Sequence, residues 1–437
     1  MRVGVIAGEF PVISETFVIK HITNLLDAGH DVDIYADYRP RVAHAHQYLM
    51  RAYHLLDRIT YMDAPPIRNG QRFATAIQRG LVCRRLAPKL TASILNPLQY
   101  GRTAISLSAL NRLYRLATTS ARYDVVHAHF GYVADRFRFV SALWDAPLVV
   151  SFHGTDCTVY PRQHGRDCYR SLFGVAAAVT ANSENTRRRL AQLGCPDQKL
   201  HQLSSAWDMD AFPFTLHPRQ PHAPIRLLSV GRLVEGKGIA YAIRAVALLR
   251  DTVPHLRYDI VRDGPLRSGL QRLIAELGLS DAVTLHGAWS SEEVQRTMAA
   301  AHLFVHACVT SREGDEEGQG MVLVEAQASG LPVVATRHGP FPEVVQDGLS
   351  GYLVPERDPA ALADRLAYLI AHPEVADAMG RAGRQHVEQR FNSRLLTAQA
   401  VTIYEAASEQ YRRMRHRAIA THDEARHTVP GDEKTTG

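Results

Sequence analysis

Two glutamates near residue 320 have the spacing to bind an extended ligand. Glu317 and Glu325 are eight positions apart in EGDEEGQGMVLVE, with Gly318 and Gly320 between them. A glycine-rich turn that opens a helix leaves backbone amides free for a phosphate or a sugar hydroxyl. Eight helical residues rise by about 12 Å, so the two carboxylates can hold two ends of one ligand but cannot share a proton. A capping acid followed by an ordinary helical glutamate explains the pattern equally.

A second candidate site is the basic turn GRLVEGKG, which covers Gly231 to Gly238. It follows a strand-like run and precedes the helix-like IAYAIRAVALLR, so Arg232 and Lys237 bracket a turn at a strand end. Doubly wound domains hold anionic ligands at this edge. The turn is neither a Walker P-loop nor a G-x-G-x-x-G motif, and a solvated basic turn is the alternative explanation.

The elements that must position these residues alternate between short strands and helices. The first 37 residues predict a strand at RVGVIA, a helix that opens at Ser14 with Glu15 in its first turn, and a strand at DVDIYA. Further strand-like runs lie at 124–128, 147–152, 176–181, 225–231, 258–261, 283–285, 303–305 and 332–335. Strands separated by helical lengths predict an α/β fold with parallel sheets.

A change of composition divides the chain. Residues 213–224 are rich in proline and polar turn formers, which predicts a linker between two doubly wound, Rossmann-like domains that face each other across a cleft. The predicted domains are residues 1–212 and 225–390. A C-terminal helix at 391–412 is expected to pack back toward the N-terminal domain. The polar residues 413–437 lack an apolar stripe and predict a loose tail.

Positive charge is concentrated in residues 64–123 of the N-terminal half. The whole chain carries a net charge of +6, but this segment contains nine arginines, one lysine and no acid. Apolar residues are interleaved at a partly helical spacing, which would leave one face apolar and the other basic. Such a face attracts anionic lipid headgroups or polyanions. A solvated basic helical hairpin is the alternative.

Composition excludes several classes of protein. The 437 residues are 46% hydrophobic and 22% charged, which is typical of two or three globular domains and excludes a disordered or collagen-like chain. Five scattered cysteines, none in a C-x-x-C pair, predict neither a disulfide framework nor a zinc site. Neither a signal peptide nor a membrane span is expected, so we expect a cytoplasmic protein, either free or peripheral on the inner face of the plasma membrane.

Several motifs together resemble a known family. GRLVEGKG, IVRDGPLR, the pair Glu317 and Glu325, GLPVVAT with PEVV, and DGLSGYLVP follow one another between Gly231 and Pro355. In this order they resemble the C-terminal half of retaining glycosyltransferases of family 4, which have the GT-B fold. FPVISETFV, VHAHFG and SFHGTD in the N-terminal half are similar to the exopolysaccharide branch, of the colanic-acid type.

The resemblance implies roles for residues on the donor side. Arg232 and Lys237, after Gly231, match the pair that binds the donor diphosphate, and Glu325 matches the acid that holds the ribose hydroxyls. Glu317 matches the acid near the donor sugar. The backbone amides of Gly318, Gln319, Gly320 and Met321 would contact the sugar and phosphate. Two fixed cations would stabilise the leaving nucleotide, so no metal ion and no cofactor is expected.

On the acceptor side, the resemblance assigns His153 to face the transferred sugar from across the cleft. Glu15 and Thr16 lie after the first strand, where the acceptor-side loop of the family approaches the donor. Two features depart from the family pattern. Arg262 stands where a small residue often precedes Asp-Gly-Pro, and SSAWDMDAF replaces a common Asn-Gly-Val-Asp run. Its Asp208-Met209-Asp210 mimics a metal-binding D-x-D motif but falls beside the predicted linker.

These observations predict a metal-independent, retaining hexosyltransferase. The donor is a nucleoside-diphosphate sugar, with UDP-hexose favoured and GDP-mannose as the second candidate. The acceptor is a saccharide or lipid-linked saccharide of exopolysaccharide or cell-surface glycan biosynthesis, an anionic membrane surface is a candidate partner, and nucleic acid is not expected. The alternatives are a GT-B sugar-nucleotide epimerase, a phosphorylase, and a non-catalytic polyanion-binding protein.

Overall fold

The structure is a computed structural model of the chain. It describes residues 1–12, 15–40, 46–62, 69–119, 121–207, 211–215 and 223–427, with the backbone alone at 69–73 and 418–427. Asp208-Met209-Asp210 and most of the predicted linker lie outside these ranges.

The N-terminal half forms a seven-stranded parallel sheet in the order β3-β2-β1-β4-β5-β6-β7. Its strands are β1 (Arg2–Glu9), β2 (Asp31–Tyr38), β3 (Ile59–Tyr61), β4 (Val125–His129), β5 (Leu148–Phe152), β6 (Ala178–Ala181) and β7 (Leu200–Gln202). Its helices are α1 (Thr16–Asp27), α2 (Gln47–Ala52), α3 (Asn69–Leu86), α4 (Pro88–Ile94), α5 (Pro97–Ile105), α6 (Ser108–Ala117), α7 (Gly131–Phe137), α8 (Val140–Trp144), α9 (Val159–His164), α10 (Arg170–Val175) and α11 (Glu184–Gln192).

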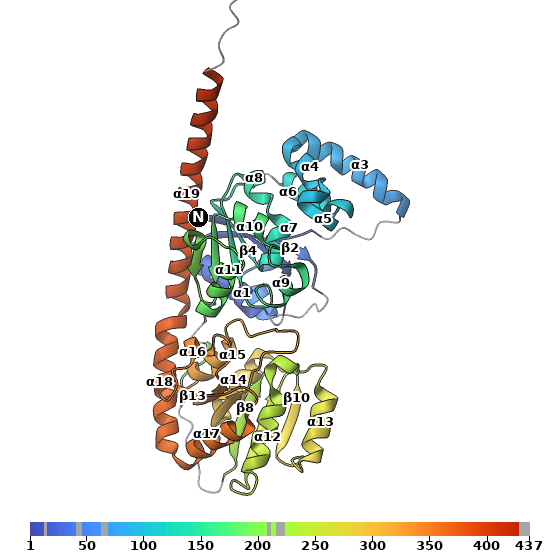
Figure 1. The fold of residues 1–437 in the computed structure, drawn as a ribbon. Helices are drawn as coiled ribbons and strands as arrows, with labels where there is room; N and C mark the ends of the chain where they lie inside the picture. Colours follow the sequence, from blue (N-terminus) through green and yellow to red (C-terminus); the bar gives the residue numbers. More distant parts are fainter. Residues whose placement is uncertain are drawn as a thin grey trace, which may run out of the picture.

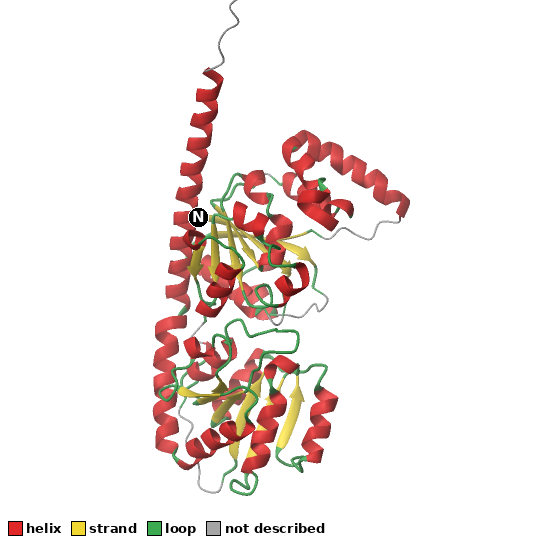
Figure 2. Ribbon diagram, in the orientation of Figure 1, coloured by secondary structure: helices red, strands yellow, loops and turns green. Residues whose placement is uncertain are grey.

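The C-terminal half forms a six-stranded parallel sheet in the order β10-β9-β8-β11-β12-β13. Its strands are β8 (Ile225–Val230), β9 (Leu256–Val261), β10 (Val283–Gly287), β11 (Leu303–His306), β12 (Val333–Thr336) and β13 (Gly351–Val354). Its helices are α12 (Ile239–Leu249), α13 (Arg267–Glu276), α14 (Ser291–Ala300), α15 (Met321–Ala328), α16 (Phe341–Val344), α17 (Pro359–Ala371) and α18 (Pro373–Phe391), and α19 (Ser393–His427) follows. The predicted α/β fold with two Rossmann-like domains is confirmed (Figure 2).

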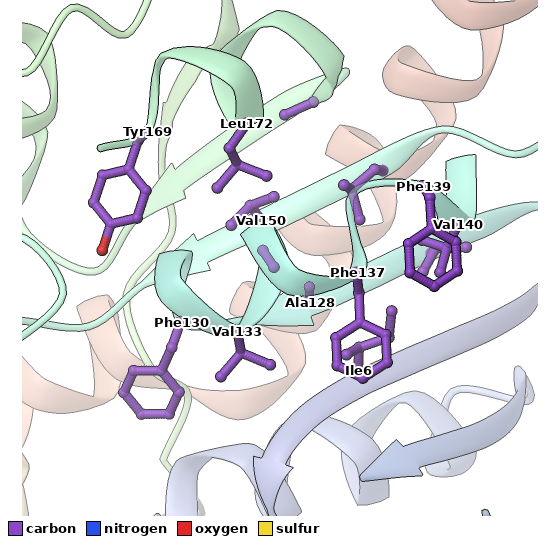
Figure 3. Close-up of a cluster of buried hydrophobic side chains, with 14 of the residues drawn as sticks. Ile6, Ala128, Phe130, Val133, Phe137, Phe139, Val140, Val150, Tyr169 and Leu172 are labelled. Atoms are coloured by element: carbon purple, nitrogen blue, oxygen red, sulfur yellow. The ribbon is translucent and has the colours of Figure 1, made fainter. Parts of the chain in front are cut away.

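Each sheet is buried on both faces, as expected for parallel strands covered by helices. One core of the N-terminal domain lies between the sheet and α7, and Figure 3 shows Ile6, Ala128 and Val150 of the sheet beneath Val133 and Phe137. The opposite face packs on α1 and α19, through residues that include Val18 and Tyr404. Continuous apolar strands such as β5 are therefore explained by burial on two sides.

Helix α19 runs alongside the N-terminal domain after α18 has packed on the C-terminal domain (Figure 1). The chain crosses between the domains here for a second time. This crossing lies beside the first one, since the Trp207 amide donates to the Phe391 carbonyl at 2.8 Å. The loose tail predicted from residue 413 is wrong as far as His427, since the helix continues to that residue. Ion pairs of Arg413 with Glu409 and of Arg415 with Asp145 support the extension, and residues 428–437 lie outside the described ranges.

Helix α1 begins at Thr16 with Glu15 as its N-terminal flanking residue, and Ser14, where the sequence placed the start of this helix, lies outside the described residues. The described part of the basic segment forms four helices, α3 to α6, beside the N-terminal sheet, rather than the two of the alternative hairpin. Among the described helices, none is long and apolar enough to cross a bilayer.

Candidate active site

A cavity of about 710 Å³ lies between the carboxyl ends of the two sheets. The N-terminal wall is formed by the loops after β1, β4 and β5, and the C-terminal wall by the turn after β8, by Arg262 after β9 and by the start of α15. Ligands of doubly wound domains bind at this edge of the sheet. The cavity therefore brings together all twelve residues that the sequence assigned to the site: Glu15, Thr16, His153, Gly231, Arg232, Lys237, Glu317, Gly318, Gln319, Gly320, Met321 and Glu325.

The turn after β8 places Lys237 in the C-terminal wall of the cavity. Gly238, next to it, has φ +60°, and a Cβ there would lie 1.8 Å from the Ala307 carbonyl oxygen, so only glycine fits. The Lys237 ammonium donates to the Glu317 carboxylate, 80 residues along the chain. The exposed Arg232 guanidinium lies near enough to Lys237 to oppose its charge, and it has no ion pair among the described residues. Two cations thus meet where an anion would be held.

Glu317 is ionised by its neighbours although it is largely buried. Burial alone would raise its pKa, but the charge and hydrogen bond of Lys237 lower that pKa to about 2. Its amide donates to His338 Nε2 at 3.0 Å, and the other ring nitrogen of His338 bonds the Glu356 carboxylate at 2.6 Å. Because Nε2 accepts, the proton of His338 sits on Nδ1. The loop that carries Glu317 is therefore fixed from behind.

The glycine turn touches the N-terminal domain across the cavity. A Cβ on Gly318 would lie 1.7 Å from the His153 carbonyl oxygen, and the Ser183 hydroxyl donates to the Gly318 carbonyl at 3.2 Å. Gln319 directs its side-chain oxygen to the Ser205 amide at 2.8 Å. Its buried Nε2 has no hydrogen-bond partner among the described residues, so this amide group remains available beside the cavity.

Glu325 lies in α15, at the far end of the same wall. Burial raises the pKa of its carboxyl to about 7, and the nearby positive charge of Arg262 opposes that rise. Arg262 lines the cavity with φ +102°, a left-handed conformation that is costly for a residue with a side chain. Its amide donates to the Gly287 carbonyl at 2.7 Å, and its guanidinium has no hydrogen bond or ion pair among the described side chains. The backbone of Arg262 is therefore strained, and its side chain contributes an unpaired cation to the cavity.

We expect the variant Arg262→Gly to be more stable but to bind the anionic ligand less well. Relief of the left-handed strain is worth about 1–2 kcal/mol, which would raise Tm by a few degrees. Loss of the cation should weaken affinity for a nucleoside diphosphate by about tenfold. Differential scanning calorimetry and titration calorimetry measure the two effects, and a variant that loses stability without losing affinity would contradict the assignment.

His153 enters the cavity from the loop after β5. The buried Asp156 carboxylate accepts the amides of His153, Gly154 and Gly131 at 2.9–3.1 Å, which holds this loop against the one that follows β4. His153 Nε2 bonds His129 Nδ1 at 3.0 Å, while its Nδ1 has no partner among the described residues. Burial lowers the pKa of His153 to about 3, so the ring is neutral at pH 7. It can therefore exchange a hydrogen bond with a sugar hydroxyl.

Glu15 and Thr16 lie on the same wall at the start of α1. Burial raises the pKa of Glu15 to about 7, and the charge of Glu9 adds to this rise. The Glu15 carboxylate has no hydrogen bond or ion pair among the described residues. An acid with a pKa near 7 in a cleft can accept a proton or a hydroxyl hydrogen bond.

Sequence reasoning missed several residues that shape the site. Phe130 packs against His153 with ring centroids 4.9 Å apart and has φ +68°, and Tyr132 lines the cavity beside it. Phe130 belongs to VHAHFG and Asp156 to SFHGTD, so the motifs contained the signal without revealing the contacts. The contact between His338 and the Glu317 amide joins residues 21 positions apart, and no motif in the sequence indicated it.

Two groups of described side chains have the chemistry of metal ligands. Around Lys237, these are His306, Cys308 and Glu317. The Lys237 ammonium already neutralises Glu317 there, so this group does not form a ready cation site. The other group is His21, His127 and His129 behind His153. His21, His127 and the Tyr404 hydroxyl bond one another at 2.5–3.0 Å, whereas the buried Nε2 of His129 has no hydrogen-bond partner among the described residues.

Comparisons with known proteins agree over most of the chain. The family of glycosyl transferases group 1 matches residues 217–386, and Glycosyltransferase Family 4 matches residues 14–211. The putative colanic acid biosynthesis glycosyltransferase WcaL of Escherichia coli K12 is 32% identical over 413 residues, which cover 93% of this chain and 100% of that protein. The amylovoran biosynthesis glycosyltransferase AmsK of Erwinia amylovora is 31% identical over 412 residues, covering 93% and 99%.

A solved structure shows the same fold. Alr3699/HepE of Anabaena, in complex with UDP and glucose, superposes with a TM-score of 0.68 at 18% identity, covering 93% of this chain and 100% of that one. The fold, the two matched families and the full-length relatives agree with each other. This chain is a GT-B glycosyltransferase of the family 4 type and is homologous to glycosyltransferases of exopolysaccharide biosynthesis.

Proposed function

We propose that this glycosyltransferase moves a hexose, with retention of anomeric configuration, from a nucleoside-diphosphate sugar to a saccharide or lipid-linked saccharide. The observation that carries the proposal is the pair of cations, Arg232 and Lys237, at the end of β8 beside the Glu317 carboxylate. Facing them across the cavity is the neutral His153. A diphosphate on the cations would direct its sugar toward the imidazole.

The same residues support a mechanism on a single face of the sugar. The bond from the anomeric carbon to the diphosphate oxygen breaks as the acceptor hydroxyl oxygen attacks from the same side, and the acceptor proton passes to the departing phosphate. Arg232 and Lys237 stabilise the charge that develops on that phosphate. The backbones of Gly154 and Gly318 approach each other closely from the two walls, and further closure around a bound donor would exclude water. A covalent double displacement is the alternative route.

The donor site is assigned to Glu325 for the ribose hydroxyls and to the backbone of Gly318 to Met321 for the sugar and phosphate. UDP-hexose is favoured, and the fold neighbour that holds UDP and glucose supports this choice. Glu15 and Thr16 are assigned to the acceptor side. A lipid-linked acceptor would place the reaction in the cytoplasm at the inner face of the plasma membrane.

We expect UDP-glucose or UDP-galactose to raise Tm by several degrees in the presence of EDTA, because the two cations replace a metal ion. GDP-mannose is the second candidate, and ADP- and dTDP-sugars serve as controls. A thermal-shift screen measures the effect. A stabilisation that appears only when a divalent cation is added would contradict metal independence.

The anomeric configuration of the product tests the function itself. With the stabilising donor and a mixture of membrane glycolipid acceptors, proton NMR of the new linkage is expected to show the configuration of the donor. An inverted product would refute the mechanism. Release of nucleotide without any transfer, together with a change in the sugar configuration, would favour the epimerase alternative.

A further inference from the structure

The outer surface of α3, α4 and α5 exposes an unusual concentration of large apolar side chains. Of the seventeen that are exposed in the described chain, six lie within residues 77–105. They are Ile77, Leu81, Leu86, Leu95, Leu98 and Ile105. Leu98 is 96% exposed and Ile105 72%. Single exposed leucines are ordinary, but a concentration on one surface marks an interaction site.

These side chains form two groups. On α3, Ile77 and Leu81 are one turn apart, and Arg84 and Arg85 follow on the next turn, whereas Leu86 at the end of the helix lies on another side. The second group is Leu95, which follows α4, together with Leu98, Arg102 and Ile105 of α5. Gly101 interrupts α5 with a non-helical conformation, so this group is not one continuous helical stripe. Each group presents exposed apolar side chains and cations together.

The cations of this layer divide into two sets. The Arg112 guanidinium is buried and donates to both Asp37 oxygens, at 2.7 and 2.9 Å, and Arg79 bonds Asn111, so these two hold α6 and α3 in place. Arg84, Arg85, Lys89 and Arg102 are exposed and have no hydrogen-bonded or ionic partner among the described residues. The segment contains no acid that could neutralise them.

The exposed surface is supported from beneath. Cys83 of α3 and Ile94 of α4 are buried in the core of the N-terminal domain, together with Leu110, Leu113 and Leu116 of α6. The layer is thus already folded around its own apolar residues, and those outside are not needed for that core. Figure 1 shows the layer projecting from the N-terminal domain, on the side away from the C-terminal domain. A large partner there would leave the cavity open to donor.

We propose that the outer surface of α3 to α5 docks on an anionic lipid bilayer. The six apolar side chains would enter the boundary between headgroups and acyl chains, and the four unpaired cations would bind lipid phosphates. The inference deepens the proposed function by naming the partner that would bring a lipid-linked acceptor to the enzyme. Its physical basis is the charge and exposure of this surface, which do not depend on the transfer reaction.

The same observations disfavour other occupants. A single-stranded nucleic acid needs aromatic side chains on which bases stack. Here Tyr100 is buried and Tyr114 lies under Arg79, while the exposed side chains are aliphatic. A second copy of the chain would place unpaired cations against unpaired cations, which is repulsive. The bilayer satisfies both the aliphatic and the cationic groups.

Flotation of the full-length protein with vesicles tests the proposal. Phosphatidylcholine vesicles are compared with vesicles that also contain phosphatidylglycerol. Each cation at an anionic surface strengthens binding by about fivefold, so Arg84→Gln/Arg85→Gln/Lys89→Gln should weaken binding by about 100-fold. Leu98→Asp/Ile105→Asp should weaken it by at least about tenfold, and by a similar factor at high salt, because insertion is not screened.

Matched controls are available on α12, where Leu248 and Arg244 are also exposed. The variants Leu248→Asp and Arg244→Gln should bind like the wild type. Equal binding to neutral and anionic vesicles, or unchanged binding of both α3–α5 variants, would overturn the proposal. So would tighter binding to single-stranded RNA than to anionic vesicles, or self-association that Leu98→Asp/Ile105→Asp abolishes.

The outcome is separable from that of the proposed function. Donor-induced stabilisation is measured on every docking variant and should equal that of the wild type, because the altered residues lie outside the cavity. Vesicle binding without stabilisation by any nucleotide sugar would support the docking surface and refute the proposed function. Stabilisation by a donor without vesicle binding would support the proposed function and refute the docking surface.

Discussion

Replacing Lys237 by alanine should lower kcat for transfer by about 10²–10³-fold, the usual loss when one charge-stabilising donor is removed from an active site. The Lys237 ammonium lines the donor end of the cavity and is held there by the Glu317 carboxylate. Without it, Arg232 alone faces the charge that develops on the departing phosphate. Nucleotide release in the presence of acceptor, followed under saturating donor, measures the effect.

A control must separate catalysis from folding. Alanine at 237 also leaves Glu317 largely buried without its cation, and breaking such a pair destabilises a protein. The double variant Lys237→Met/Glu317→Gln removes both charges at similar volume, so its Tm should lie nearer the wild type than that of Lys237→Ala. We expect the double variant to stay as inactive as the single one. Recovery of transfer in the double variant would mean that Lys237 acts only by supporting Glu317.

Affinity for the nucleotide sugar should rise about tenfold between pH 6 and pH 8, because burial raises the pKa of Glu325 to about 7. The ionised carboxylate is the better acceptor for two ribose hydroxyls, so the protonated form at pH 6 binds less well. In Glu325→Gln the pH dependence should vanish, and affinity at pH 8 should fall by about 10–100-fold. Titration calorimetry with a UDP-sugar, whose diphosphate does not titrate in this range, checks both results.

Glu15→Gln provides the matched control, since burial also raises the pKa of Glu15 to about 7 but on the opposite wall. Glu15→Gln should keep the pH dependence of donor binding.

The stability of the ligand-free protein supplies a further check on Glu325. The folded-state pKa of Glu325 lies above its ordinary value of 4.5, so ionisation opposes folding, and stability falls as pH rises from about 4.5 through 7 and then levels off. The ligand-free Glu325→Gln should therefore gain more Tm at pH 8 than at pH 5, whereas equal Tm changes would show a solvated carboxyl.

The elements that form the C-terminal wall of the cavity were predictable because each is a contiguous run of strand, turn and helix, or of turn and helix. β8, the turn with Lys237 and α12 follow one another, as do the turn at Gly318 and α15, so apolar runs and glycines located them. The strands β3, β7 and β13 were missed. Each is only three or four residues long and is an edge strand of its sheet, and such a short apolar run gives little signal.

Helix α19 shows the opposite error. Composition predicted its end near residue 412, since the polar residues beyond lack an apolar stripe. The backbone is helical to His427, and the last described ion pair to the domain joins Arg415 to Asp145. Asp145, which is 270 positions away from Arg415, thus helps to hold the end of α19 on the domain. A local sequence pattern does not report such a contact.

By itself, the sequence determined the fold class, the family and which residues of the C-terminal domain line the cavity, because these depend on local periodicity and on motifs read within one segment. Only the tertiary structure decided their chemical state. It paired Lys237 with Glu317, left Glu325 buried with a pKa near 7, and divided the basic segment into a buried Arg112 and free cations such as Arg102. The physical reason is that charge state and exposure depend on neighbours brought together by the packing of two sheets, whereas a periodic pattern reports only which side of its own element is apolar.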